Sequence, residues 1–239
     1  MTPQLSIIIP CFNEIKNIRP LLVQMQDIVN KSQLIIEVIV IDGGSTDNTQ
    51  KELKKIFNYL PRNIFKLILR KNKKGYGYDI NKALNSANGK ILSWTHADMQ
   101  TDPKDIIEAY NLYVNSKSKK IIIKGKRKNR KFLDVFFTFG MQIVVYILLR
   151  QKLDDINAQP KLFSKEFYIT YIKDNAPSDF SLDLYLLYQA KINNFKIKEI
   201  PVFFKDRIHG EAKGGGSLKG KINLVMRTFK YILKLRKLF

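Results

Sequence analysis

The sequence predicts an α/β fold with a mostly parallel central sheet and helices on both of its faces. Short β-branched runs such as Leu5–Pro10 alternate along the chain with segments whose apolar residues recur at helical spacing. Polar and glycine-rich residues follow the ends of these runs, which is typical of open parallel sheets. The chain has 239 residues, 45% of them hydrophobic, which is enough for one domain with its own core.

The individual elements follow from the same patterns. Continuous apolar runs predict buried strands at Leu5–Pro10, Glu37–Ile41, Phe65–Leu69, Ile91–Trp94, Lys120–Ile123, Asn157–Phe163 and Phe195–Val202. Helical spacing predicts helices from Ile18 to Val29, from Gly77 through Ala87, from Pro103 to Val114 and from Ser181 to Ala190. Asp102 and Pro103 suit the first positions of the third helix, because Asp is a good N-cap and Pro fits the first turn.

The stretch from Lys90 to Pro103 is the strongest candidate for a functional site. Its apolar strand ends in a polar segment that contains His96, Asp98 and Gln100. These three residues alternate, so an extended backbone would place all three side chains on one side. An imidazole, a carboxylate and an amide oxygen could then hold a divalent cation and the phosphates that it bridges. The alternative is an ordinary strand end with a solvated cap.

Two later segments raise the question of membrane contact. Phe132–Leu149 is at the lower limit for a membrane span and contains Asp134, so a buried helix or an interfacial helix is favoured over a span. The residues from Ser217 onward predict a basic amphipathic helix, with one apolar and one basic stripe. The apolar stripe is Ile222, Val225, Met226, Phe229 and Leu233. Such a helix would lie on an anionic membrane surface, or else pack on the domain with a solvated basic face.

The charge balance predicts anionic partners. The chain carries 42 Lys and Arg against 21 Asp and Glu, a net charge of +21. Residues 117–131 contain nine basic residues and residues 212–239 contain eight, with no acid in either block. Nucleic acid is not favoured as the partner, because these blocks carry no recognised nucleic-acid motif. The single Cys11 excludes an intrachain disulfide, and the N-terminus lacks a secretory signal, so a cytoplasmic location is expected.

Seven segments in this order resemble family-2 glycosyltransferases of the GT-A (Rossmann-like) fold. They are IIIPCFNE, VIVIDGGSTDNT, KGYGYDINKALNSANGK, HADMQTDP, NAQPKLF, FSLDL and DRIHGEAK. Within that family the chain is most similar to the dolichyl-phosphate mannose synthase and polyprenyl-phosphate glycosyltransferase branch. The resemblance implies a glycosyltransferase domain over residues 1–216, followed by the basic helix over residues 217–239 at the membrane surface.

The resemblance also implies roles for individual residues. Pro10, Phe12, Glu14 and Asp42 match the positions that hold the nucleotide base and ribose. Asp98 matches the second carboxylate of the family's Asp-x-Asp metal motif, and Gln100 a residue beside the metal and phosphates. Arg127 matches a phosphate-binding arginine, Arg207 and Lys213 match the pair that grips the acceptor phosphate, and Asp183 matches an acidic residue near the acceptor.

One departure from the family concerns the metal. His96 stands where the first Asp of Asp-x-Asp is expected, so the need for a divalent metal, and the choice between Mn²⁺ and Mg²⁺, stay open. A His–Asp pair favours Mn²⁺, since Mg²⁺ prefers oxygen ligands.

The function that this predicts is inverting transfer of a sugar from a nucleotide-diphosphate sugar to a polyprenyl phosphate, by a protein that is peripheral on the cytoplasmic face of the membrane. A first alternative is transfer to a saccharide or glycolipid hydroxyl, with Asp183 as general base. A second alternative is a non-catalytic protein that binds nucleotides or an anionic surface through a degenerate site.

Overall fold

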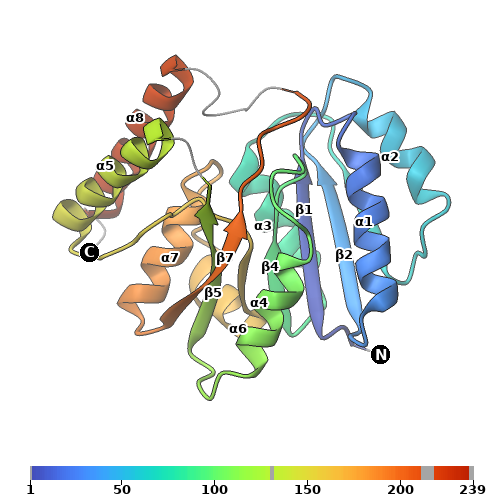
Figure 1. Ribbon diagram of the computed structural model, residues 1–239, viewed down its shortest axis with the longest axis horizontal. Helices are drawn as coiled ribbons and strands as arrows, with labels where there is room; N and C mark the ends of the chain where they lie inside the picture. Colours follow the sequence, from blue (N-terminus) through green and yellow to red (C-terminus); the bar gives the residue numbers. More distant parts are fainter. Residues whose placement is uncertain (1, 130–131, 211–217, 237–239) are drawn as a thin grey trace.

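A computed structural model describes residues 2–129, 132–210 and 218–236 of the protein. Seven strands form one sheet in the order β3-β2-β1-β4-β6-β5-β7 (Figure 1). Their bounds are β1 Leu5–Cys11, β2 Ile36–Asp42, β3 Phe65–Leu69, β4 Ile91–Trp94, β5 Ile121–Lys128, β6 Lys161–Ser164 and β7 Lys196–Phe203. Every neighbouring pair is parallel except those that β6 makes with β4 and β5. The predicted mostly parallel sheet is therefore confirmed.

The strands differ from the expected bounds in two places. The strand predicted at Asn157–Phe163 begins only at Lys161, because the Ala158 N–H bonds back to the Asp155 carbonyl in a turn and Pro160 has no N–H to donate to the ladder. Strand β5 extends beyond Ile123 to Lys128, so part of the first basic block lies within the sheet.

The helices for which the sequence predicted bounds agree with those bounds to within a few residues. The helices are α1 Ile18–Lys31, α2 Thr49–Phe57, α3 Tyr76–Ser86, α4 Asp105–Val114, α5 Phe132–Leu149, α6 Lys165–Phe167, α7 Leu182–Ile192 and α8 Leu218–Arg236, with a π-helical turn η1 at Tyr168–Ile172. Of these elements, α2, α6 and the turn η1 are additional to those predicted. Helix α4 starts two residues later than predicted. The Asp102 carboxylate accepts the Lys104 N–H at 2.9 Å and forms a turn ahead of the helix.

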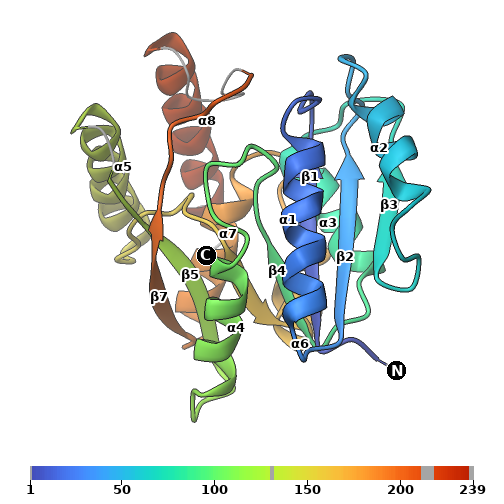
Figure 2. The ribbon, with the colours of Figure 1, turned by 45° about the vertical axis from the view of Figure 1, so that its right-hand side comes forward.

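Alternate residues of the strands face two separate cores. Ile7, Ile9, Val38 and Val40 pack with helices α1, α2 and α4 on one face of the sheet. Ile8, Ile39 and Ile41 pack with α3, α6 and α7 on the other. Figure 2 shows this layering, with α1 and α4 in front of the sheet and α3 and α7 behind it. The period of two along each strand thus produces the three-layer fold.

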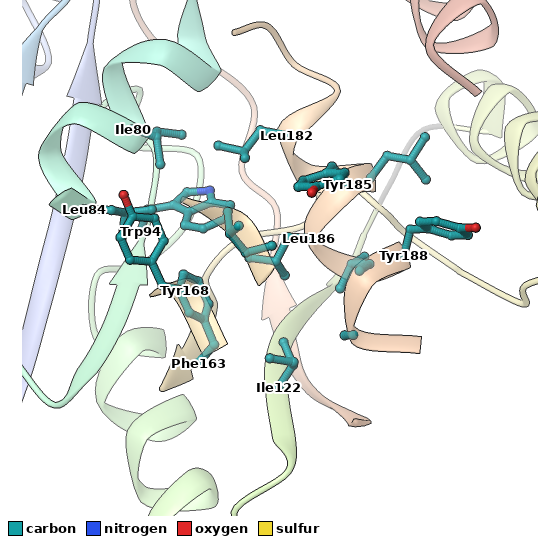
Figure 3. Packing of buried hydrophobic residues seen from close by; sticks show 14 of the residues in the cluster. Ile80, Leu84, Trp94, Ile122, Phe163, Tyr168, Leu182, Tyr185, Leu186 and Tyr188 are labelled. Atoms are coloured by element: carbon teal, nitrogen blue, oxygen red, sulfur yellow. The ribbon is translucent and has the colours of Figure 1, made fainter. Parts of the chain in front are cut away.

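The second core is built around the end of β4. Trp94 is fully buried and meets the ring of Phe163 edge-on at 5.5 Å (Figure 3). Helix α7 is buried along almost its whole length, and Leu182, Leu186 and Tyr185 surround the same cluster. This packing fixes the carboxyl end of β4, and the polar segment that leaves it, against a rigid base.

Helices α5 and α8 lie side by side beyond the β5–β7 edge of the sheet (Figures 1 and 2). Ile232 and Leu235 of α8 are buried in the same core as Val145 and Leu149 of α5. The last turns of α8 are therefore packed, while Ile222, Met226, Phe229 and Leu233 of the predicted apolar stripe are exposed. Within the part of the chain that the structure describes, no helix has the length and hydrophobicity of a membrane span.

Candidate functional site

The polar segments after three parallel strands meet at one edge of the sheet. Strands β1, β2 and β4 run in the same direction, and Cys11 at the end of β1 is paired with Asp42 at the end of β2. The Thr95 N–H, just beyond β4, bonds to the Ile8 carbonyl at 3.1 Å. The loops that follow these strands are therefore neighbours, which is the place where open α/β sheets bind ligands.

Asp42 is fully buried and organises the loop after β2. One of its oxygens accepts the N–H groups of Gly44 at 3.0 Å and Ser45 at 2.9 Å, and also the side-chain amide of Gln50 at 2.6 Å. Its other oxygen faces the Cys11 thiol at 3.6 Å. Burial, together with the Asp42 carboxylate, raises the pKa of Cys11 well above its ordinary value. The sequence-predicted Asp42 thus holds the turn that Gly44 makes with its positive φ of 91°.

Phe12 and Glu14 lie on the loop after β1. The Phe12 ring lies beneath the ammonium of Lys73, 4.3 Å from its centre. Glu14 is buried, its N–H donates to the Thr49 hydroxyl at 3.0 Å, and its carboxylate accepts from Asn17 at 2.6 Å. Pro10 lies within β1, one residue before the strand ends. The four residues proposed for the base and ribose therefore share one corner of the sheet edge.

The segment after β4 does not have the expected extended backbone. Met99 takes a left-handed conformation, with φ at 61°, which reverses the chain between Asp98 and Gln100. The three side chains make different contacts. His96 lies 5.8 Å from the ring of Tyr76, Asp98 accepts the Gln100 N–H at 3.2 Å, and the Gln100 amide turns to the Lys205 carbonyl at 3.0 Å.

Residues 204–210, which we call the strap, cross this edge after β7. The Lys205 N–H donates to the Gln100 carbonyl at 2.8 Å, and the Asn17 side chain donates to the His209 carbonyl at 3.3 Å. Arg207 lies between them. Its guanidinium donates to the Asp98 carboxylate at 2.7 Å and to the Glu14 carboxylate at 3.1 Å. Three residues that the sequence proposed for separate roles are therefore joined in one ion-pair cluster.

Arg127 is engaged away from that cluster. Its backbone N–H and its guanidinium both donate to the carboxylate of Asp155, at 2.7 and 2.8 Å. The guanidinium also stacks on Phe204 of the strap, 5.2 Å from the ring centre. Asp155 balances the charge of Arg127, so a phosphate would have to compete with that carboxylate. Lys213, the other predicted acceptor ligand, lies outside the described residues.

Asp183 forms a second, separate cluster. It lies at the start of α7, is buried, and contacts the ammonium of Lys161 at 3.0 Å and the side-chain amide of Gln159 at 2.8 Å. Burial lowers the pKa of Lys161, and the Asp183 carboxylate opposes that shift. The sequence analysis did not identify Lys161 and Gln159 as partners of Asp183. A lysine inside a short strand pattern was the available signal, since a buried lysine needs a partner.

The donor set at Asp98 suits a cation that brings its own ligands. No group of three or more His, Cys, Asp or Glu residues that could hold a metal ion occurs among the described residues. A cation that bridges a diphosphate needs only one or two protein ligands, because phosphate oxygens and water supply the rest. The Arg207 guanidinium already contacts one oxygen of Asp98 and supplies a positive charge at the position proposed for a metal ion. The site fits a metal–diphosphate better than a bare metal.

Comparisons with known proteins identify the family of the chain. The family model described as glycosyl transferase family 2 matches residues 6–144. Dolichyl-phosphate beta-glucosyltransferase of Dictyostelium discoideum is 24% identical over 98% of this chain and 76% of its own length. Dolichol-phosphate mannosyltransferase of Pyrococcus furiosus and dodecaprenyl-phosphate galacturonate synthase of Rhizobium johnstonii are each 24% identical. This chain covers 64% and 65% of their lengths, and they match 98% and 97% of this chain.

The fold is also found among solved structures. Glucosyl-3-phosphoglycerate synthase from Mycobacterium tuberculosis, in complex with Mn²⁺, uridine-diphosphate-glucose and phosphoglyceric acid, superposes with a TM-score of 0.75 at 15% identity. The match covers 98% of this chain and 80% of that one. The architecture supports the family model, which spans more than half of the residues. The chain belongs to glycosyl transferase family 2.

Proposed function

We propose that this enzyme transfers a sugar from a nucleoside-diphosphate sugar to a polyprenyl phosphate, with inversion at the anomeric carbon. The observation that carries the proposal is the state of Asp183. A hydroxyl acceptor needs a general base, and the candidate base is buried in an ion pair with Lys161 at 3.0 Å. A phosphate acceptor is already anionic near neutral pH and needs no base. The names of the relatives, which are dolichyl, dolichol and dodecaprenyl phosphate enzymes, support the same class of acceptor.

The proposed reaction is a single displacement. An oxygen of the acceptor phosphate forms a bond to the anomeric carbon, while the bond from that carbon to the diphosphate oxygen breaks. The electron pair leaves with the nucleoside diphosphate, so no proton is transferred. The protein then has to orient the two substrates and to stabilise the charge of the leaving diphosphate.

The donor would lie on the loops after β1, β2 and β4. Pro10, Phe12, Glu14 and Asp42 are proposed for the base and ribose, and Asp98 with His96 for a divalent metal. When bound, Mn²⁺ or Mg²⁺ would neutralise negative charge on the diphosphate. The Mn²⁺ and uridine-diphosphate of the Mycobacterium structure support Mn²⁺ as the first ion to try. Gln100 and Arg127 are proposed to act near the phosphates by holding the strap, since both contact it.

The acceptor phosphate would be held by Arg207 with Lys213. Arg207 lies on the strap and contacts the Asp98 carboxylate, so its positive charge would lie next to the proposed position of the donor phosphates. Arginine makes two charge-assisted hydrogen bonds to a phosphate, each stronger than a neutral hydrogen bond. A sugar hydroxyl would gain far less from the same side chain.

The α5–α8 pair is the proposed membrane contact. Phe139, Ile143 and Ile147 of α5 and Met226 and Phe229 of α8 are exposed apolar side chains. Arg227, Lys230 and Lys234 of α8 are exposed beside them. An anionic bilayer would attract these charges by about 1 kcal/mol each. The proposed location is the cytoplasmic face of the membrane. Binding of the protein to anionic liposomes should weaken as salt rises, and salt-independent binding would contradict an electrostatic contribution.

The decisive experiment is a transfer assay analysed by mass spectrometry. The purified protein would be incubated with Mn²⁺, a panel of nucleotide sugars and one of three acceptors: a short polyprenyl phosphate, the matching polyprenol, or a saccharide or glycolipid. A glycosylated polyprenyl phosphate is the expected product, with none from the polyprenol. Transfer only to saccharide or glycolipid hydroxyls would refute the proposed acceptor. Donor binding without transfer or hydrolysis would instead identify a non-catalytic binder.

A further inference from the structure

The contacts of Arg207 close the place where the donor phosphates are expected. Its guanidinium bridges Asp98 at 2.7 Å and Glu14 at 3.1 Å, and only 14% of its side chain is exposed. The carboxylates that it joins come from the loops after β4 and β1. The strap that carries Arg207 is tied down by Gln100 on one side and by Asn17 on the other.

This bridge already gives Asp98 a cationic partner. The carboxylate has one oxygen on the Gln100 N–H and the other on Arg207. Two largely buried carboxylates cannot simply lose their cation, because an unpaired buried charge is costly. Another positive charge must therefore arrive when the guanidinium leaves. A metal ion carried by a nucleoside diphosphate supplies that charge.

One feature of Arg207 weakens its ion pairs with Asp98 and Glu14. The Nε atom of Arg207 is buried and has no hydrogen-bond partner among the described residues. A buried donor without a partner costs about 1–3 kcal/mol, which weakens the closed arrangement. Once Asp98 has accepted another cation, the same guanidinium is free to bind phosphate oxygens.

We propose that Arg207 is a latch that closes the empty donor site by holding Asp98 and Glu14, and that a metal–nucleoside diphosphate displaces it and so makes it available to the acceptor phosphate. The proposal rests on the proposed function insofar as Asp98 receives the metal–diphosphate. It adds an order to the reaction, since the acceptor ligand is released only after the donor has bound. A lipid phosphate would then not occupy the site before a metal–nucleoside diphosphate is bound.

The first test measures the binding of Mn²⁺ with UDP, and of Mn²⁺ with GDP, by isothermal titration calorimetry. A latch that is closed in nine molecules out of ten lowers the apparent affinity about tenfold. Arg207→Ala should therefore bind the better of the two probes about tenfold more tightly than the parent. Lys205→Ala is the matched control, because it removes a positive charge from the same strap while Lys205 contacts Gln100 only through its backbone. Unchanged or weaker binding by Arg207→Ala would overturn the proposal.

A second test needs no ligand. Hydrogen exchange of the backbone amides of residues 204–210 should be faster in Arg207→Ala than in the parent, and unchanged in Lys205→Ala. Equal exchange in all three proteins would also overturn the latch. Arg207→Lys serves if the alanine variant does not fold, because lysine keeps the charge but cannot bridge two carboxylates in the same fork. Neither test involves a sugar or a lipid, so a failed transfer assay and a failed latch give different results.

Discussion

The molecule contains two clusters in which carboxylates pair with a cation, and the two differ in how far solvent reaches their side chains. Arg207 with Asp98 and Glu14 keeps 7–14% of each side chain exposed, whereas Lys161 and Asp183 keep only 0% and 2%. The first joins the loops after β1 and β4 to the strap, and the second joins β6 to the start of α7. The difference teaches that burial separates the two clusters. We infer that only the more accessible one can exchange its cation, because a ligand's charge could replace that of Arg207 there.

The buried cluster should give the largest effect when it is broken. Lys161→Met leaves Asp183 as an unpaired buried charge and should lower the free energy of unfolding by about 3–5 kcal/mol. Urea denaturation followed by circular dichroism measures this loss. The double variant Lys161→Met with Asp183→Leu should recover much of it, since it buries no charge. A single variant as stable as the parent would show that the pair is not a structural unit.

The exchangeable cluster should give a large effect on turnover instead. Asp98→Asn removes the charge that holds the metal–diphosphate and should lower kcat by about 10²–10³. The melting temperature should stay close to that of the parent, because the side chain keeps its shape. Steady-state kinetics with the polyprenyl phosphate acceptor provides the measurement. Near-normal turnover in a folded Asp98→Asn protein would remove Asp98 from the proposed site.

Arg207→Ala should change the two substrates in opposite directions. The acceptor kcat/KM should fall at least tenfold, about 1.4 kcal/mol, because a charge-assisted phosphate contact is lost. Donor binding should become tighter for the reason given for the latch. Initial rates with each substrate varied in turn separate the two effects. An unchanged acceptor kcat/KM would return the hydroxyl acceptor to consideration.

A third carboxylate, Asp105, has only the more distant charge of Lys205, among the cations that the structure describes, to oppose the effect of burial. Asp105, in the first turn of α4, has a buried Oδ2 with no partner in the described chain, and burial, Asp102 and Glu108 raise its pKa to about 6. The folded protein therefore holds a proton that the unfolded chain releases near pH 4. Its contribution to stability is lost as the pH rises from about 4 through 6. Asp105→Asn should be modestly more stable than the parent at pH 7.5, with little difference at pH 4. The same stability difference at both pH values would contradict this.

The strands and the two-sided core followed from the sequence because they depend on local patterns. Ile7 and Ile9 alternate with Ile8, and this alternation alone assigns them to opposite faces. The same reasoning failed after Trp94, where Met99 reverses the chain. A left-handed residue at a methionine has no sequence signature, so the row of His96, Asp98 and Gln100 could not be excluded beforehand.

The site clusters depend on contacts across long stretches of chain. Arg207 meets Glu14 across 193 positions, and no local pattern encodes which carboxylates the strap will reach. Asp183 was identified as a candidate, but its neutralisation by Lys161 depends on how β6 packs beside α7. The antiparallel direction of β6 likewise follows from the path through α5. The chain leaves the sheet at the end of β5 and re-enters it at that same edge, so β6 runs in the reverse direction.

Cys11 has a practical consequence for experiments on the strap. It is the only cysteine of the chain, it is buried, and its raised pKa keeps it in the unreactive thiol form. A cysteine introduced at Ile208, whose side chain is 77% exposed, would therefore be the single thiol that a maleimide dye or spin label can reach. The wild-type background thus already allows one-site labelling, and distance measurements from that label can follow the strap while a nucleotide is added.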